Sequence, residues 1–76
     1  MAETKHCFEW RFACNGSWIT FDIENQNILE TIWQAGIFQT SLKDSNFNNE
    51  EVYVNLENLY VARYNRGGFI ICRFLC

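Results

Sequence analysis

The sequence predicts a single small α+β domain in which one helix packs on a curved antiparallel sheet of about five or six strands. Three observations predict this class. An Asn-Gly pair separates two short strand-like segments near the start of the chain, one amphipathic helical segment follows, and the second half holds strand-like segments separated by turn residues. The chain has 76 residues, which is enough for one modest hydrophobic core.

Composition and charge exclude several classes of function. Hydrophobic residues make up 49% of the chain and aromatic residues 17%, which favours a packed globule over disorder. The net charge of −3 argues against general DNA or RNA binding, which needs a basic surface. No segment resembles a signal peptide or a membrane span, so we expect an intracellular protein, cytoplasmic or nuclear. Residues 1–6 are expected to be a flexible leader to a domain at residues 7–76.

The first two predicted strands form a hairpin. Apolar and polar residues alternate over residues 7–13, as in a half-buried strand, and a second strand is predicted at residues 18–21. Between them, Asn15 and Gly16 both accept the positive φ of a type I′ turn. A two-residue loop of this type fixes which residues lie opposite one another on the two strands.

This register separates the two tryptophans of the hairpin. Cross-strand partners share a face of a sheet, and successive pairs alternate between faces. Trp18 therefore lies on one face with Arg11 as a diagonal neighbour. Two explanations of its position are open: a later strand or the chain ends cover Trp18, or Trp18 and Arg11 form a platform for a ligand with an aromatic base and a phosphate. The other face collects an apolar set that we expect to be core: Trp10, Phe12, Ile19 and Phe21.

One helix is predicted from Asn27 to about Ala35. Asn27 and Glu30 have the spacing of a capping box, and Gly36 can adopt the left-handed conformation that ends a helix. Four apolar residues repeat with helical spacing, which predicts a stripe buried against the sheet. They are Ile28, Leu29, Ile32 and Trp33.

The second half of the chain predicts a loop and three strands. Residues 42–50 are polar and without periodicity, so we expect an exposed loop there. Strands are predicted at residues 52–56, 60–64 and 69–75, and the Arg-Gly-Gly sequence at residues 66–68 joins the last two into a hairpin.

The polar residues predict neither an enzyme nor a metal site. The single histidine, His6, lies in the expected leader, and no serine or cysteine has a visible base as partner. The four cysteines could form two disulfides or bind zinc, but their spacing favours free buried thiols. We therefore expect no cofactor and no metal. The cysteines are Cys7, Cys14, Cys72 and Cys76.

Five residues of the first half resemble the WWE domain in order and spacing: Trp10, Trp18, Phe21, Glu30 and Gly36. This family takes its name from two tryptophans and one glutamate, here Trp10, Trp18 and Glu30. The later stretch NLENL at residues 55–59, followed by a glycine turn and a last strand, is similar to the family's second half. The resemblance covers about residues 8–75.

The resemblance implies a half-barrel sheet with one helix, found as a module in ubiquitin ligases and ADP-ribosyltransferases. Many members bind the ADP-ribose or iso-ADP-ribose units of poly(ADP-ribose), and Trp18 stands at a position that lies at their pocket. This chain departs from those members at several ligand positions. The family's usual tyrosine, tyrosine, glutamine, arginine and aspartate are here Arg11, Val52, Val61, Ile71 and Asn55.

Two functions therefore stay open. The favoured one is a non-catalytic WWE-like module with a degenerate pocket, which contacts a protein partner or neighbouring domains within a ubiquitination or ADP-ribosylation protein. Apolar residues at three ligand positions favour it, because they leave phosphate groups without a partner. The alternative is a module that binds ADP-ribose units of poly(ADP-ribose). Its ligand-binding residues would be Trp18, Arg11, Arg63 and Arg73, the last two replacing lost polar contacts.

Overall fold

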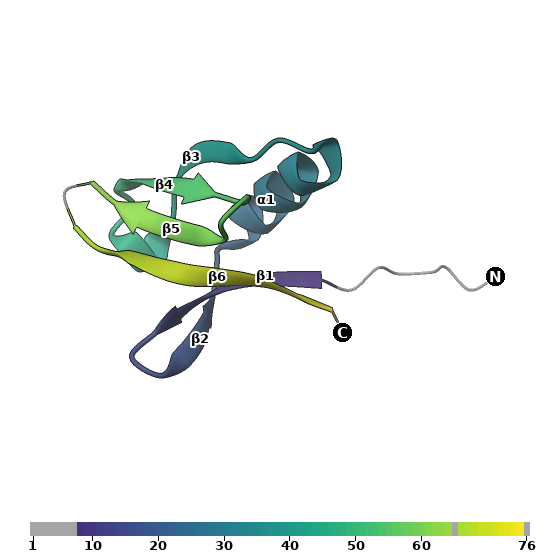
Figure 1. Cartoon of the computed structure of the whole chain (residues 1–76). Coiled ribbons are helices and arrows are strands. Elements are labelled where there is room, and N and C mark those ends of the chain that lie inside the picture. Colours follow the sequence, from purple (N-terminus) through teal and green to yellow (C-terminus); the bar gives the residue numbers. More distant parts are fainter. Residues whose placement is uncertain (1–7, 65, 76) are drawn as a thin grey trace.

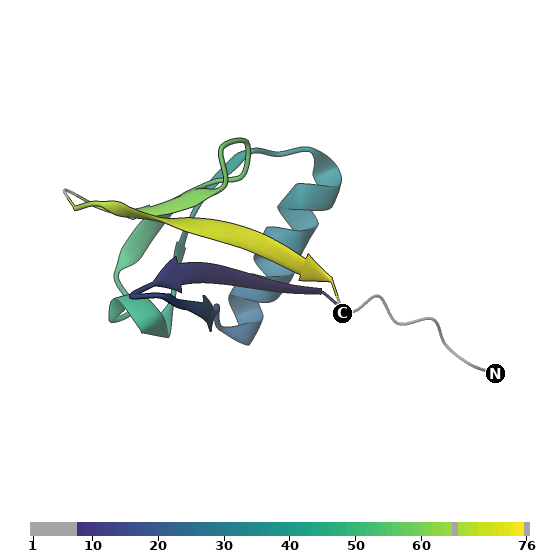
Figure 2. The same cartoon turned by 60° about the horizontal axis from the view of Figure 1, so that its bottom comes forward.

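The computed structural model describes residues 8–64 and 66–75, and these residues form a curved antiparallel sheet with one α-helix. The sheet is an open half-barrel, and α1 lies along one of its faces (Figures 1 and 2). The order of strands across the sheet is β2-β1-β6-β5-β4-β3. The predicted α+β class is confirmed, and the expected leader at residues 1–6 lies outside the described residues. In chain order the elements are β1 (Phe8–Cys14), β2 (Ser17–Thr20), α1 (Ile23–Ala35), β3 (Gln39–Lys43), the 3₁₀ helix η1 (Ser45–Phe47), β4 (Glu51–Asn55), β5 (Tyr60–Arg63) and β6 (Gly68–Leu75).

The first hairpin has the predicted turn and register. Asn15 and Gly16 both have positive φ, at 53° and 81°. The strands pair Cys14 with Ser17 and continue in the predicted register along the hairpin. Trp10, on the face that was expected to be core, has no exposed surface.

The helix begins at Ile23 rather than at Asn27, and the predicted capping box is wrong. Asn27 lies inside the helix, where backbone N–H groups donate to carbonyls of the preceding turn. The Glu30 carboxylate accepts hydrogen bonds from other side chains instead of reaching back to a helix start. Gly36 ends the helix as predicted, with φ 73°. Its left-handed conformation costs glycine little, because glycine has no Cβ.

The predicted apolar stripe of α1 is only partly core. Leu29 is completely buried, but Ile28 and Trp33 are 40% and 41% exposed, so the expectation fails for these two. Polar residues take part of the helix surface that faces the sheet. The side-chain amide of Gln26 accepts from the N–H of Trp10 at 2.6 Å and donates to its carbonyl oxygen at 2.8 Å. This bridge places Gln26 on the side of the helix that faces the sheet, while part of the apolar stripe faces solvent.

The expectation of an exposed loop at residues 42–50 is also wrong. Leu42 lies in β3, and Phe47 in η1 is only 2% exposed. The ring of Phe47 lies 4.9 Å from that of Phe12 on β1. A single aromatic residue thus anchors a polar segment to the core, and one residue gives no periodicity in the sequence.

Two aspartates fasten this segment to the start of α1. The buried Asp44 carboxylate accepts the N–H of Asp22 at 2.8 Å and the amide of Asn25 at 2.8 Å. In return, the Asp22 carboxylate accepts the N–H and the hydroxyl of Ser45, at 2.7 and 2.6 Å. These hydrogen bonds from Ser45 lower the pKa of Asp22. The reciprocal contacts satisfy polar groups at the starts of both helices.

The last three strands lie where they were predicted, within one residue at each end. At the β5–β6 turn, a Cβ on Gly68 would lie 2.9 Å from the carbonyl oxygen of Val61, so glycine is required for close approach. Among the described residues, no helix combines the length and apolar character needed to cross a membrane. The buried hydrophobic residues are Trp10, Phe12, Phe21, Leu29, Leu42, Phe47, Val52, Val54, Leu56, Val61 and Ile71.

Candidate functional site

The four residues predicted to bind a ligand lie on two opposite faces of the sheet. We call the face covered by α1 the inner face and the opposite one the outer face. Arg63 and Arg73 lie on the inner face, because each pairs across the sheet with a buried core residue. Arg11 and Trp18 lie on the outer face, as the hairpin register requires. The structure therefore does not bring the four residues into one site.

On the outer face, Trp18 and Arg11 both pack on Phe74 of β6. The Trp18 ring meets the Phe74 ring edge-on at 5.1 Å, and the Arg11 guanidinium lies 4.5 Å from the centre of the same ring. Arg11 also donates to the Glu9 carboxylate at 2.6 Å. Trp18 is still 45% exposed. Phe74 of the later strand β6 therefore partly covers Trp18. It contacts the same two side chains, Trp18 and Arg11, that were considered as a platform for an aromatic ligand.

On the inner face, Arg73 is held by Glu30 of α1. Its Nε and Nη2 donate to the two carboxylate oxygens at 2.8 and 2.7 Å. The indole of Trp10 and the amide of Gln34 donate to the same carboxylate. These contacts lower the pKa of Glu30 to about 2, with the Arg73 hydrogen bond as the largest cause, and they raise the pKa of Arg73. Arg73 therefore links β6 to the helix, and its charge is already paired.

Arg63 has no such partner among the residues that the structure describes. Its guanidinium lies 5.3 Å from the Phe47 ring centre and 5.8 Å from that of Phe69. Its Nε is buried, and none of the described residues accepts a hydrogen bond from it. A cation over two aromatic rings with an unused donor is the feature of the inner face that is best suited to an anion.

Three of the five positions that correspond to ligand contacts in the WWE resemblance lie in the closed core. Val52, Val61 and Ile71 are 2%, 0% and 1% exposed. Tyr53, which follows the first of them, faces outward as its place in the strand predicts, since it pairs with Ser41 and Ala62 on the outer face. There is no room at these three apolar positions for a charged ligand group.

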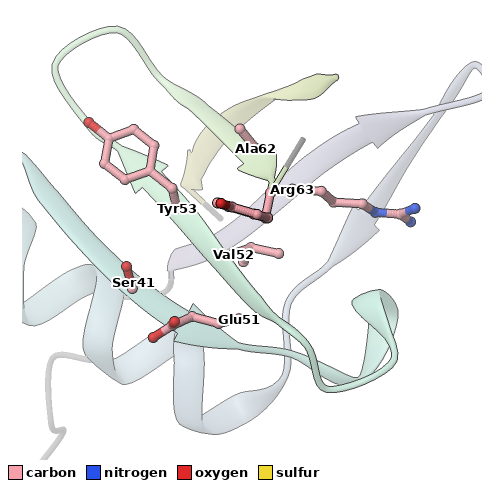
Figure 3. A pocket seen from close by; sticks show the side chains of 7 residues that line it. Ser41, Glu51, Val52, Tyr53, Ala62 and Arg63 are labelled. Carbon is pink, nitrogen blue, oxygen red and sulfur yellow. The ribbon is translucent and has the colours of Figure 1, made fainter. Parts of the chain in front are cut away.

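A hollow of about 410 Å³ on the outer face, which the sequence analysis missed, crosses β3, β4 and β5 (Figure 3). Glu51 and Tyr53, which alternate along β4, supply acidic and aromatic lining, and Tyr64 lies in the turn directly after β5. Strand alternation together with the strand order could therefore have located the hollow. Strand order, however, is not visible in a single sequence. The lining residues are Ser41, Glu51, Val52, Tyr53, Ala62, Arg63 and Tyr64.

The cysteines do not converge within the described part of the chain. Cys14 and Cys72 are half-buried free thiols, while Cys7 and Cys76 lie outside the described residues. In residues 8–64 and 66–75, no three histidine, cysteine, aspartate or glutamate side chains are grouped to hold a metal ion.

No family model matches the chain, and no curated protein matches it. The functional interpretation therefore depends on the residues and their geometry.

Proposed function

We propose that the chain is a non-catalytic, WWE-like interaction module with a degenerate nucleotide pocket. It contacts a protein partner, or neighbouring domains of its own chain, within a protein of ubiquitination or ADP-ribosylation. The order of hairpin, helix and strand meander supports the WWE-like part of this proposal. So does the hydrogen bond of 3.0 Å between Trp10 and Glu30, because it joins two of the three residues that give the family its name.

The burial of Val52, Val61 and Ile71 is the observation that carries the proposal. An ADP-ribose ligand brings two phosphates that must find donors when they leave water. Apolar side chains in a closed core supply none. Arg73, which could replace a lost contact, already forms two hydrogen bonds with Glu30.

Protein contact is favoured by what the outer face exposes. Trp18 and Ile70 are 45% and 65% exposed and lie on the face that no helix covers, and Tyr64, in the turn after β5, is 85% exposed. Large apolar and aromatic side chains gathered on one face are typical of surfaces that bind other proteins. The ionised groups with the strongest contacts, Glu30 and Asp22, have their hydrogen bonds within the fold, which supports a non-catalytic role.

Arg63 favours the alternative function, binding of an ADP-ribose unit. Its buried Nε lacks a partner among the described residues, and the rings of Phe47 and Phe69 beside it offer apolar contact. A phosphate could use the free donor only if it reached the inner face between these side chains.

Titration of the ¹⁵N-labelled protein with ADP-ribose and with iso-ADP-ribose, followed by NMR, separates the two functions. We expect no amide shifts up to about millimolar ligand, which corresponds to a binding free energy weaker than roughly −4 kcal/mol. A Kd tighter than about 10 μM, or roughly −7 kcal/mol, would overturn the degenerate-pocket proposal. In that case Arg63→Gln should abolish binding if the inner face is used, and Trp18→Ala should abolish it if the outer face is used.

A further inference from the structure

The outer-face hollow is walled by aromatic side chains. Tyr53 comes from β4 and Tyr64 from the turn directly after β5, and Ser41 and Ala62 form part of its lining. The Tyr53 ring is fixed in place, since it lies 5.9 Å from the Tyr60 ring and its hydroxyl accepts from an amide of the same strand at 3.2 Å. Tyr64 is 85% exposed. The hollow thus offers one fixed aromatic ring and one exposed ring.

The charge that faces this hollow is negative. Glu51 lines it with an exposed carboxylate, which makes no ion pair with any described residue. Arg63 is also in the lining, but its guanidinium extends to the inner face, away from the side occupied by Tyr53 and Ser41 (Figure 3). Lys43 lies opposite Glu51 across β3 and β4, at the margin of the hollow rather than in its lining.

We propose that this hollow binds the cationic side chain of a lysine or arginine in a basic segment of a protein partner. The proposal rests on the protein-contact function given above and names the chemistry of the contact. A cation is attracted by the face of an aromatic ring and by a carboxylate at the same time. An anion would meet the Glu51 carboxylate, because the guanidinium of Arg63, the one basic residue of the lining, extends to the inner face. The net charge of −3 also favours a basic partner.

The first test uses a blocked tripeptide, acetyl-Gly-Lys-Gly-amide, with the norleucine peptide of nearly the same shape as its uncharged match. NMR titration of the labelled protein should shift the amides of Ser41, Tyr53 and Ala62. We expect a Kd of about millimolar for the lysine peptide, and binding of the norleucine peptide at least tenfold weaker. Equal shifts with both peptides, shifts confined to the Trp18 and Phe74 region, or no shifts up to about 10 mM lysine peptide would each overturn the proposal.

Two substitutions test the two components of the proposed contact, the carboxylate and the exposed aromatic ring. Glu51→Gln and Tyr64→Ala change exposed side chains and should weaken lysine-peptide binding at least threefold. Glu57→Gln removes the same charge from an exposed turn outside the hollow and should leave binding unchanged. Equal effects of Glu51→Gln and Glu57→Gln would mean that general attraction to an acidic protein accounts for the shifts, and the site would be rejected.

The ADP-ribose titration keeps this proposal separate from the proposed function. A flat ADP-ribose titration with no lysine-peptide binding would reject the cation site and leave the protein-contact function in place. Tight ADP-ribose binding would reject the degenerate pocket, whatever the lysine peptide does.

Discussion

The indole nitrogen of Trp10 lies 3.0 Å from the Glu30 carboxylate, and Arg73 donates two hydrogen bonds to the same group. Glu30 thereby ties α1 to β1 and β6. We expect Glu30→Gln to lower the free energy of unfolding by roughly 2–3 kcal/mol, because it removes charge-assisted hydrogen bonds and leaves Arg73 unpaired in a largely covered position. Urea unfolding of both proteins, followed by fluorescence, measures the difference.

The control for this variant is Glu57→Gln, which removes an exposed carboxylate in the β4–β5 turn. Its effect should stay within about 0.5 kcal/mol. A similarly small effect of Glu30→Gln would show that the Glu30 contacts do not hold the helix to the sheet.

Stability should fall in acid through the same carboxylate. The pKa of Glu30 in the folded protein is about 2, against an ordinary value of 4.5. Between these values the unfolded chain binds more protons than the folded one, so the stabilisation is complete above the unfolded pKa and is lost as pH falls toward the folded pKa. Unfolding measured from about pH 5 to about pH 2 should therefore show a shallower pH dependence for Glu30→Gln than for the parent protein.

Some acid sensitivity should remain in Glu30→Gln, since Asp22 also has a lowered pKa. The hydroxyl of Ser45 is the largest cause of that shift. Ser45→Ala should therefore further reduce the dependence of the unfolding free energy on pH. Identical pH curves for the parent and both variants would contradict the assignment to these carboxylates.

Phe47 should matter more to stability than its polar surroundings predict. It is 2% exposed and packs against Phe12 and Phe69. Phe47→Ala should cost roughly 3–5 kcal/mol, the usual loss for emptying an aromatic core site. Phe38, which is 52% exposed, is the matched control and should cost about 1 kcal/mol or less. Equal losses in denaturant unfolding would show that η1 is not anchored in the core.

The sequence predicts five of the six strands of this fold, because turn chemistry and alternation are local properties, but it did not predict β3. The Asn15-Gly16 turn fixed the hairpin register, and with it the opposite facing of Trp10 and Trp18. The helix start was missed because Asp22 uses its carboxylate on Ser45, which is distant in the chain, rather than on its own helix. Local capping patterns cannot reveal such a partner.

The candidate site was less predictable, because it depends on which strands become neighbours. Phe74 covers Trp18 and Arg11 only because β6 pairs with β1. The hollow beside Tyr53 likewise exists only because β3, β4 and β5 lie side by side. The residue patterns predicted the order of hairpin, helix and later strands but could not show that Arg73 would pair with Glu30.

In the structure, Leu29 should contribute more to stability than Trp33, the reverse of the ranking that the apolar stripe predicts. The sequence pattern treats Trp33 and Leu29 as equal members of the core, with the larger residue contributing more. In the structure Leu29 is completely buried, whereas Trp33 is 41% exposed and contacts Trp10 edge-on at 5.6 Å. Leu29→Ala should cost roughly 3 kcal/mol, because it leaves a cavity in the core. Trp33→Ala should cost about 1–2 kcal/mol, the sum of one aromatic pair and partial burial. Denaturant midpoints of the two variants decide the ranking, and a greater loss for Trp33→Ala would mean that α1 sits on the sheet as the sequence pattern predicts.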